Sequence, residues 1–74
     1  MKALKDDPRY VARIMRRILK DQVTTRDMDR DTVRMIFDTG LLVKREWPAF
    51  VIMCTARGND YLAAAGGDNG SDQV

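Results

Sequence analysis

Residues 40–62, GLLVKREWPAFVIMCTARGNDYL, decide the fold that this sequence predicts. They contain two apolar-rich runs, residues 41–46 and 49–54, separated by Trp47-Pro48. Because proline has no backbone N–H and cannot donate to a strand ladder, the Trp-Pro pair indicates a turn. The two runs therefore predict an antiparallel β-hairpin that bends at this pair.

The sequence that follows the second run predicts a helix over residues 55–65. Thr55 offers a hydroxyl oxygen to the free amide groups of the first helical turn. Gly58 lowers helix propensity, which favours the interpretation that it permits close approach to a neighbouring element. Residues 66–74, GGDNGSDQV, have almost no apolar content and predict a disordered tail. We therefore expect one domain over residues 1–65, followed by that tail.

The clearest amphipathic pattern lies near the start of the chain. Asp7-Pro8 is typical of a helix start, and apolar residues follow at helical spacing over residues 8–20. The opposite face of this predicted helix carries cations alone: Arg9, Arg13, Arg16, Arg17 and Lys20. Three interpretations stay open for this basic face. It binds nucleic-acid phosphates, it binds an acidic protein partner, or it is solvated and paired with the chain's own Asp27, Asp29 and Asp31.

A break is predicted between this helix and the hairpin. One helix over residues 25–39 would place charges on its apolar side, so we expect a short helix over 25–29 and another over 31–39. Thr24 or Thr25 can cap the short helix. The second helix has a core face of Val33, Ile36 and Phe37 and an outward face of Asp31, Arg34, Met35 and Asp38. Gly40 predicts the left-handed residue that ends it.

These elements predict an α+β fold, mainly α, with a β-hairpin in the C-terminal half and the order α-α-α-β-β-α. A two-stranded hairpin is marginal alone, so helices must cover one of its faces. Its second strand is apolar on both faces, which favours contact with a partner. Trp47 either folds back over the strands or serves as an exposed anchor. A domain of 74 residues buries roughly 60% of its unfolded surface, so dimerisation is kept open.

The composition excludes several kinds of active site. The chain has no histidine, and its one serine is Ser71 in the predicted tail. Serine–histidine and cysteine–histidine arrangements and the usual zinc ligand sets are therefore missing, as is a glycine-rich phosphate loop. We expect no enzyme, no catalytic residue, no cofactor and no metal site. Cys54 lies in an apolar run and is interpreted as a small buried hydrophobe.

The same sequence gives an expectation about compartment. No run of about 18 apolar residues is present, which predicts no transmembrane helix and no membrane partner. Residues 1–10 are charged, which predicts no secretory signal, and the single cysteine predicts no internal disulfide. We therefore expect a cytoplasmic protein.

The predicted order of elements resembles the winged helix-turn-helix family of compact bacterial or prophage type, over about residues 8–65. Residues 31–42, DTVRMIFDTGLL, look like the family's recognition helix running into the wing. Residues 55–62, TARGNDYL, look like the T-x-x-G-x-x-Y-L that follows the wing. The resemblance implies a small nucleic-acid-binding protein, a transcriptional regulator of bacterial or phage origin that binds double-stranded DNA as a dimer.

The resemblance also assigns roles to particular residues. Base-facing roles fall on the predicted second long helix, at Arg30, Thr32, Arg34 and Met35. Wing contacts fall on Lys44 and Arg45. Phosphate contacts from the basic face of the first helix would come from Arg13, Arg16 and Arg17.

The alternative function is a protein-interaction module with the same fold. Outward aspartates on residues 31–39 oppose phosphate binding, and the expected turn is Glu46-Trp47-Pro48 rather than a basic tip. A phage-encoded adaptor or inhibitor of a host protein would fit, with an acidic or apolar partner. Its interface is expected at Met35, Trp47, Phe50, Val51 and Met53. A third interpretation is that the apolar strand completes a partner's sheet.

Overall fold

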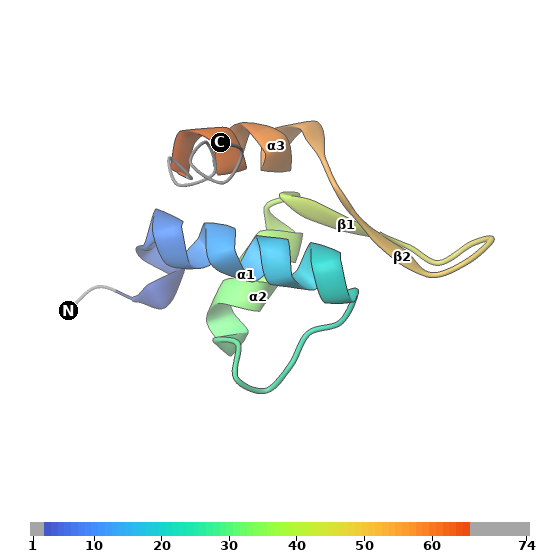
Figure 1. The fold of residues 1–74 in the computed structure, drawn as a ribbon, viewed down its shortest axis with the longest axis horizontal. Coiled ribbons are helices and arrows are strands. Elements are labelled where there is room, and N and C mark those ends of the chain that lie inside the picture. The colour runs from blue at the N-terminus through green and yellow to red at the C-terminus, as the bar shows by residue number, and fades with distance from the viewer. Residues whose placement is uncertain (1–2, 66–74) are drawn as a thin grey trace.

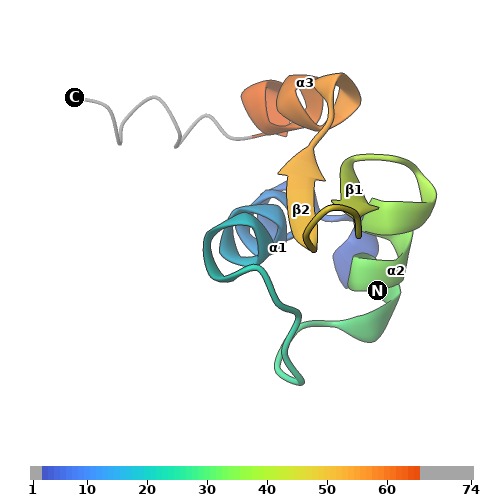
Figure 2. The same ribbon diagram turned by 90° about the vertical axis from the view of Figure 1, so that its right-hand side faces the viewer.

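The computed structural model describes residues 3–65 of the chain. The elements are η1 (Leu4–Asp6), α1 (Pro8–Asp21), α2 (Arg30–Asp38), β1 (Leu42–Arg45), β2 (Val51–Cys54) and α3 (Ala56–Ala65). Figures 1 and 2 show α1 and α2 side by side, α3 above them, and the hairpin projecting from the helical body. The predicted α+β class and the order α-α-α-β-β-α are confirmed. The tail expected at residues 66–74 lies outside the described residues.

Helix α1 begins and ends as its sequence indicates. The Asp7 carboxylate accepts a hydrogen bond from the Arg9 backbone N–H at 3.1 Å, and Pro8 occupies the first helical position. The helix extends one residue beyond the predicted range and ends at Gln22, which has a left-handed φ of 61°. Its buried face provides a large part of the core: Val11, Ala12, Ile14, Met15 and Ile18.

The short helix predicted over residues 25–29 is wrong. The segment makes one turn, in which the Met28 N–H donates to the Thr25 carbonyl at 3.1 Å. Neither Thr24 nor Thr25 caps a helix; Asp29 does, accepting from the Thr32 N–H at 3.0 Å. Because Asp29 satisfies the first free amides of α2, this helix begins at Arg30, one residue before the predicted start at Asp31. The third helical element that precedes the hairpin is instead the short 3-10 helix η1, which lies before α1.

The exit from α2 forms a Schellman motif. Gly40, with φ of 79°, donates its N–H to the Phe37 carbonyl at 3.2 Å, and Leu41 donates to the Ile36 carbonyl at 3.0 Å. The predicted glycine end of this helix is therefore confirmed. Leu41 and Leu42 are then both buried at the start of the hairpin.

The hairpin is antiparallel, with strands shorter than the predicted runs. Leu42 lies opposite Cys54, Val43 opposite Met53, Lys44 opposite Ile52, and Arg45 opposite Val51. Leu42 and Ile52 are buried and define the core face of the hairpin. The predicted turn at Trp47-Pro48 is confirmed, and this peptide bond is cis.

Thr55 fixes the start of α3 against the end of α2. Its hydroxyl accepts from the Gly58 N–H at 2.9 Å and donates to the Gly40 carbonyl at 2.5 Å. Its own N–H donates to the Leu41 carbonyl at 3.3 Å. Gly58 is buried, and the close approach predicted for it is confirmed, because the Leu41 carbonyl lies directly against its Cα. In the described part of the chain no helix is both long and apolar enough to cross a membrane.

Candidate functional site

An open groove runs between the turn at residues 24–29, the exposed side of α2, and β1. We call it the α2 groove. Its charged lining consists of Arg26, Arg30, Arg34 and Lys44 together with Asp27, Asp29 and Asp38. Its remaining lining consists of Leu4, Tyr10, Thr24, Thr25, Met28, Val33 and Phe37. The lining of the groove therefore combines charges of both signs with apolar side chains.

Three of the predicted nucleic-acid-binding residues are brought together in this groove. Arg30 and Arg34 are one helical turn apart, so both point to the same side of α2. Lys44 joins them from β1, with its ammonium 4.8 Å from the centre of the Phe37 ring, within cation–π distance. Arg26 adds a fourth cation, from the turn at residues 24–29, that was not among the predicted site residues.

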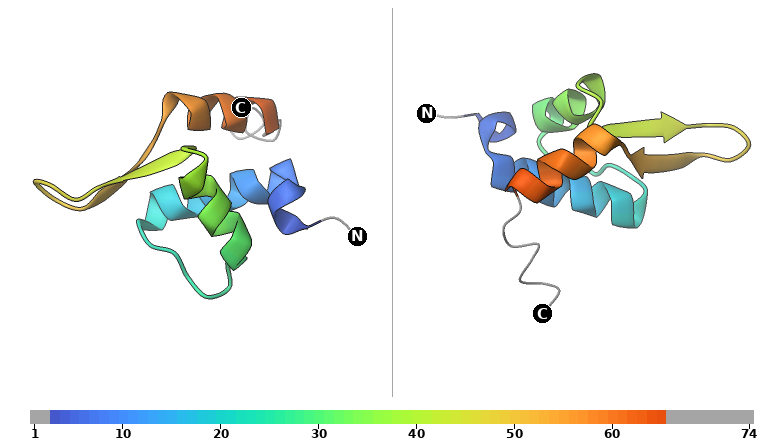
Figure 3. Two further views of the ribbon diagram at one scale, coloured as in Figure 1. Left: turned by 180° about the vertical axis from the view of Figure 1, so that it is seen from behind. Right: turned by 90° about the horizontal axis from the view of Figure 1, so that it is seen from above.

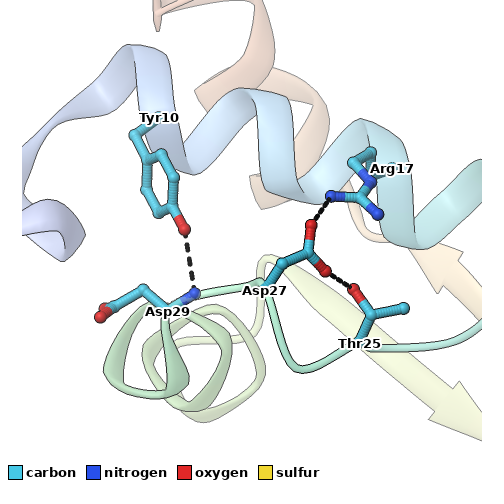
Figure 4. Close-up of polar contacts among 5 residues, drawn as sticks. All are labelled: Tyr10, Arg17, Thr25, Asp27 and Asp29. Carbon is cyan, nitrogen blue, oxygen red and sulfur yellow. Dashed lines mark hydrogen bonds and ion pairs between the residues drawn. The ribbon is translucent and has the colours of Figure 1, made fainter.

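One aspartate at the groove is already paired with a cation. The Asp27 carboxylate accepts from the Arg17 guanidinium at 2.6 Å and also accepts from the Thr25 hydroxyl (Figure 4). These hydrogen bonds, led by the one from Arg17, lower the Asp27 pKa to about 2. For Arg17, internal pairing with an aspartate is therefore the interpretation that the contacts support.

The Arg17–Asp27 pair predicts a pH-dependent contribution to stability. Because the folded pKa of Asp27 lies below its value in the unfolded chain, near 4, the contribution is complete above pH 4. It is lost progressively as the pH falls from about 4 through about 2. We expect Asp27→Asn to lower the unfolding temperature at pH 7 and to have a smaller effect at pH 2, measured by circular dichroism melts.

The matched control for this prediction is Asp60→Asn, which removes an exposed carboxylate from α3. Its effect on the unfolding temperature is expected to be small at both pH values, as for most surface substitutions. An Asp27→Asn effect that is equally large at pH 7 and pH 2 would contradict a role for the carboxylate charge.

Tyr10 and Asp29 link α1 to the start of α2. The Tyr10 hydroxyl accepts a hydrogen bond from the Asp29 N–H at 2.9 Å (Figure 4). Asp29 in turn accepts from both the N–H and the hydroxyl of Thr32, at 3.0 and 2.8 Å. Both contacts fix where α2 begins, and α2 carries two cations of the groove.

The base-facing role predicted for Thr32 is wrong. Its side chain is fully buried and donates to Asp29, so it cannot contact a ligand. Met35 was also predicted to face outward, but it is half-buried and packs against the core. Val33 and Phe37, predicted as core, are half-buried: both pack against the core and also line the groove. Ile36 is fully buried, as predicted, and Thr32 is buried because it lies one helical turn before Ile36 on the same side of α2.

The other predicted cations are placed away from the groove lining. Arg13 is exposed and Arg16 is half-buried, both on α1. Arg45 is exposed on β1, opposite Val51 and therefore on the face of the hairpin directed away from the core. The predicted nucleic-acid-binding cations are therefore divided among three places: the surface of α1, the α2 groove and the outer face of the hairpin.

The hairpin provides a second candidate surface, which we call the apolar arm: residues 42–54. Four large apolar side chains on it are exposed: Trp47 by 82%, Phe50 by 55%, Val43 by 46% and Met53 by 39%. Val43 and Met53 are cross-strand neighbours on the outer face. Trp47 is therefore exposed rather than folded back. Of the predicted interface, Trp47, Phe50 and Met53 are accessible, and Val51 is half-buried.

Cys54 does not form part of either surface. It is half-buried against the core, and its thiol donates to the Asn59 side-chain oxygen at 3.3 Å. Burial raises the pKa of the thiol, which disfavours the reactive thiolate. Within residues 3–65, no cluster of three or more histidine, cysteine, aspartate or glutamate side chains could hold a metal ion.

Comparison of the chain with protein-family models, with curated proteins and with solved structures found no match. Its function is therefore inferred from the α2 groove and the apolar arm. The groove offers cations for an anionic ligand, and the arm offers apolar side chains for a protein surface.

Proposed function

We propose that the chain is a small nucleic-acid-binding protein that binds double-stranded DNA through the α2 groove. The observation that supports this most is the convergence of Arg26, Arg30, Arg34 and Lys44 on one groove from three different segments. Phosphate contacts dominate the affinity of such proteins, and arginine also recognises guanine edges. A transcriptional regulator of bacterial or phage origin is the function that fits this surface best.

The charge balance of the groove supports this proposal. Its three aspartates are not equivalent, because Asp27 is neutralised by Arg17 and Asp29 accepts hydrogen bonds at the start of α2. Asp29 also lies at the positive end of the helix dipole, which offsets its charge. Asp38 is the remaining carboxylate of the lining. The four cations therefore face less opposing charge than the sequence alone suggests.

The arrangement of elements fits the proposed winged helix-turn-helix as well. In such a protein α2 would enter the major groove with Arg30 and Arg34 near the bases, and the hairpin would lie along the adjacent backbone. Lys44 and Arg45 are both exposed on β1 and could contact phosphates there. The body from α1 to α3 then serves to hold the helix and the hairpin at a fixed angle.

The proposal predicts a measurable salt dependence. Three to four phosphate contacts would make the logarithm of the association constant fall with a slope of about −3 to −4 against the logarithm of salt concentration. We expect Arg34→Gln to weaken duplex binding about 10-fold and to reduce the slope by about 1. Fluorescence anisotropy with a labelled random-sequence duplex, titrated from low salt upward, measures both.

The control is Lys20→Gln, which removes one exposed cation of α1 that lies outside the groove lining. It should leave the affinity within about twofold, since only long-range charge is lost. Equal weakening by Lys20→Gln and Arg34→Gln would indicate nonspecific attraction rather than a groove. No binding at low salt would remove the proposal.

A protein-interaction module, such as an adaptor or inhibitor of a host protein, is the second candidate. The observation that favours it is the exposure of Trp47, Phe50 and Met53 on the projecting hairpin. For this function, Trp47→Ala should abolish co-purification of the partner while the circular dichroism spectrum stays unchanged. Unchanged co-purification by the folded variant would count against it.

A further inference from the structure

Arg26 reaches the α2 groove from an exposed turn rather than from a helix or a strand. Figures 1 and 3 show the chain leaving the end of α1 and swinging away from the helical body before it enters α2. Residues 23–27 of this turn are all exposed. Within residues 3–65, the Arg26 side chain makes no hydrogen bond or ion pair of its own. Its position therefore depends on what holds the backbone on either side of it.

One carboxylate holds the backbone on both sides of Arg26. One oxygen of Asp27, the next residue, accepts from the Arg17 guanidinium at 2.6 Å. The other oxygen accepts from the hydroxyl of Thr25, the residue before Arg26 (Figure 4). Such a side-chain bridge fixes a turn as a backbone hydrogen bond does. Because Arg17 belongs to a helix with five buried residues, the bridge is tied to a rigid element.

The two ends of the turn are held by separate contacts. Gln22 is hydrogen-bonded to β2, and the Asp29 N–H is hydrogen-bonded to α1 at 2.9 Å. Between these ends, in the described part of the chain, residues 23–27 have one polar contact with another element, the ion pair with α1. Loss of that pair should therefore loosen the middle of the turn and leave the fold in place.

We propose that Arg17 and Asp27 are positioning residues for the α2 groove. Their ion pair holds the turn against α1 in the conformation that brings Arg26 to the other cations of the groove lining. This role rests on the proposed DNA binding, and it adds two residues that need not touch the DNA. Ordering the turn before DNA arrives lowers the entropy that binding has to overcome.

Charge alone predicts the opposite effect for Asp27. Its carboxylate is part of the groove lining, so removal of a negative charge there should strengthen the binding of a polyanion. Positioning predicts weaker binding, because Arg26 is no longer held in place. The two explanations differ in sign, and one variant therefore separates them.

The test measures duplex binding by fluorescence anisotropy with the full chain. We expect Asp27→Ala to weaken binding about 5-fold and to reduce the salt slope by about 1, as the loss of one phosphate contact does. Arg17→Gln should weaken binding by at least as much, although it changes the net charge in the other direction. Circular dichroism should show that both variants fold, because both side chains of the pair are largely exposed.

A double-mutant cycle separates positioning from a general loss of stability. In an Arg26→Gln background, Asp27→Ala should change the affinity by less than about twofold, since the cation that it positions is already gone. In an Arg34→Gln background its full effect should remain. The matched control is Asp60→Ala, which removes the same charge from α3, outside the groove lining. It should leave the affinity within about twofold.

The order of the turn gives a measurement that needs no DNA. The order parameter of the Arg26 backbone N–H, from ¹⁵N relaxation of the free protein, should fall toward about 0.6 in Asp27→Ala. The order parameters of α1 should stay near about 0.85, the value of rigid backbone. An Arg26 N–H that is as ordered in the variant as in the native chain overturns the positioning role, whatever the DNA measurements show.

The remaining outcomes distinguish this role from DNA binding itself. A native chain that binds DNA, with an Asp27→Ala variant that binds it more tightly, overturns the positioning role and leaves the proposed function standing. Equal weakening by Asp27→Ala with and without Arg26 also overturns it, because the carboxylate then acts through another group. A native chain that binds no duplex at low salt removes the proposed function and the positioning role together.

Discussion

We expect Gly58→Ala to destabilise the fold more than any other single methyl addition in the described chain. A Cβ atom at this position would overlap the Leu41 carbonyl oxygen and lie 2.9 Å from the Cys54 sulfur. The sulfur belongs to a side chain, but the carbonyl is backbone and also accepts hydrogen bonds from Thr55. To make room, α3 must move away from the end of α2, which weakens those hydrogen bonds.

The expected cost is about 3 kcal/mol, at the upper end of overpacking effects. Domains of this length have a total stability of only several kcal/mol. At about 4–8 °C per kcal/mol, the unfolding temperature should fall by about 12–24 °C. Thermal denaturation followed by circular dichroism measures this shift. A fall of less than about 3 °C would mean that α3 adjusts freely and that the contact is not tight.

Gly40→Ala is the matched control, because it adds the same methyl group where there is space. A Cβ atom at Gly40 would have no neighbour within 4 Å, but the backbone φ of 79° is unfavourable for alanine. The expected cost is about 1 kcal/mol, from the left-handed conformation alone. The order of the two effects, Gly58 larger than Gly40, separates steric overlap from backbone strain.

Most of the fold could be predicted because its signals are local. Asp7-Pro8, Gly40 and Trp47-Pro48 each fix the backbone through their own chemistry, and all three mark element boundaries in the structure. The close approach at Gly58 could be predicted as well, because a glycine within a short helix otherwise only lowers its stability.

The errors arose where side chains compete for the same free amides. Thr24, Thr25 and Asp29 are all good caps, and propensity alone does not choose among them. Asp29 prevails because its N–H is also held by Tyr10 from α1, a contact that depends on tertiary packing. With Asp29 as the cap, residues 25–28 are left outside a helix and α2 begins at Arg30, one residue before the predicted start.

The sequence could indicate which residues belong to the candidate site, but not which of them the fold brings together. The pattern identified Arg30, Arg34 and Lys44, yet it could not show that Arg26 joins them or that Arg17 turns to Asp27. Arg17 and Asp27 are ten positions apart, and Arg26 lies in a turn outside the helix that carries Arg30 and Arg34, so helical periodicity reaches neither contact. The exposure of Trp47 was left open for the same reason, since it depends on how far the hairpin extends beyond the helices.

The side-chain amide of Gln22 should be the most important polar group between α1 and the hairpin, and no sequence pattern indicated it. Gln22 donates to the Leu19 carbonyl at 2.9 Å and makes two hydrogen bonds with Ile52, one through each backbone group. It thereby occupies the edge of β2 as a third strand would. Its left-handed φ of 61° is what directs the side chain there after α1 ends.

We expect Gln22→Asn to cost about 2–3 kcal/mol, because partly buried backbone groups of Ile52 lose their partners. Asparagine tolerates the left-handed conformation well, so the loss reports the shorter side chain rather than backbone strain. Amide hydrogen exchange measures the effect locally: the Ile52 N–H should exchange faster relative to the N–H groups of α1. Urea denaturation measures it globally.

Gln22→Gly and Gln22→Glu show which part of the amide matters. Glycine frees the backbone further but supplies no side chain, so it should be as destabilising as asparagine. Glutamate keeps an acceptor for the Ile52 N–H at 2.7 Å but loses the donor to the Ile52 carbonyl, so it should preserve protection of that N–H while still lowering stability. If all three variants were as stable as the native chain, water would replace the glutamine at this edge. The hairpin would then be held to α1 by apolar packing alone, chiefly that of Ile52.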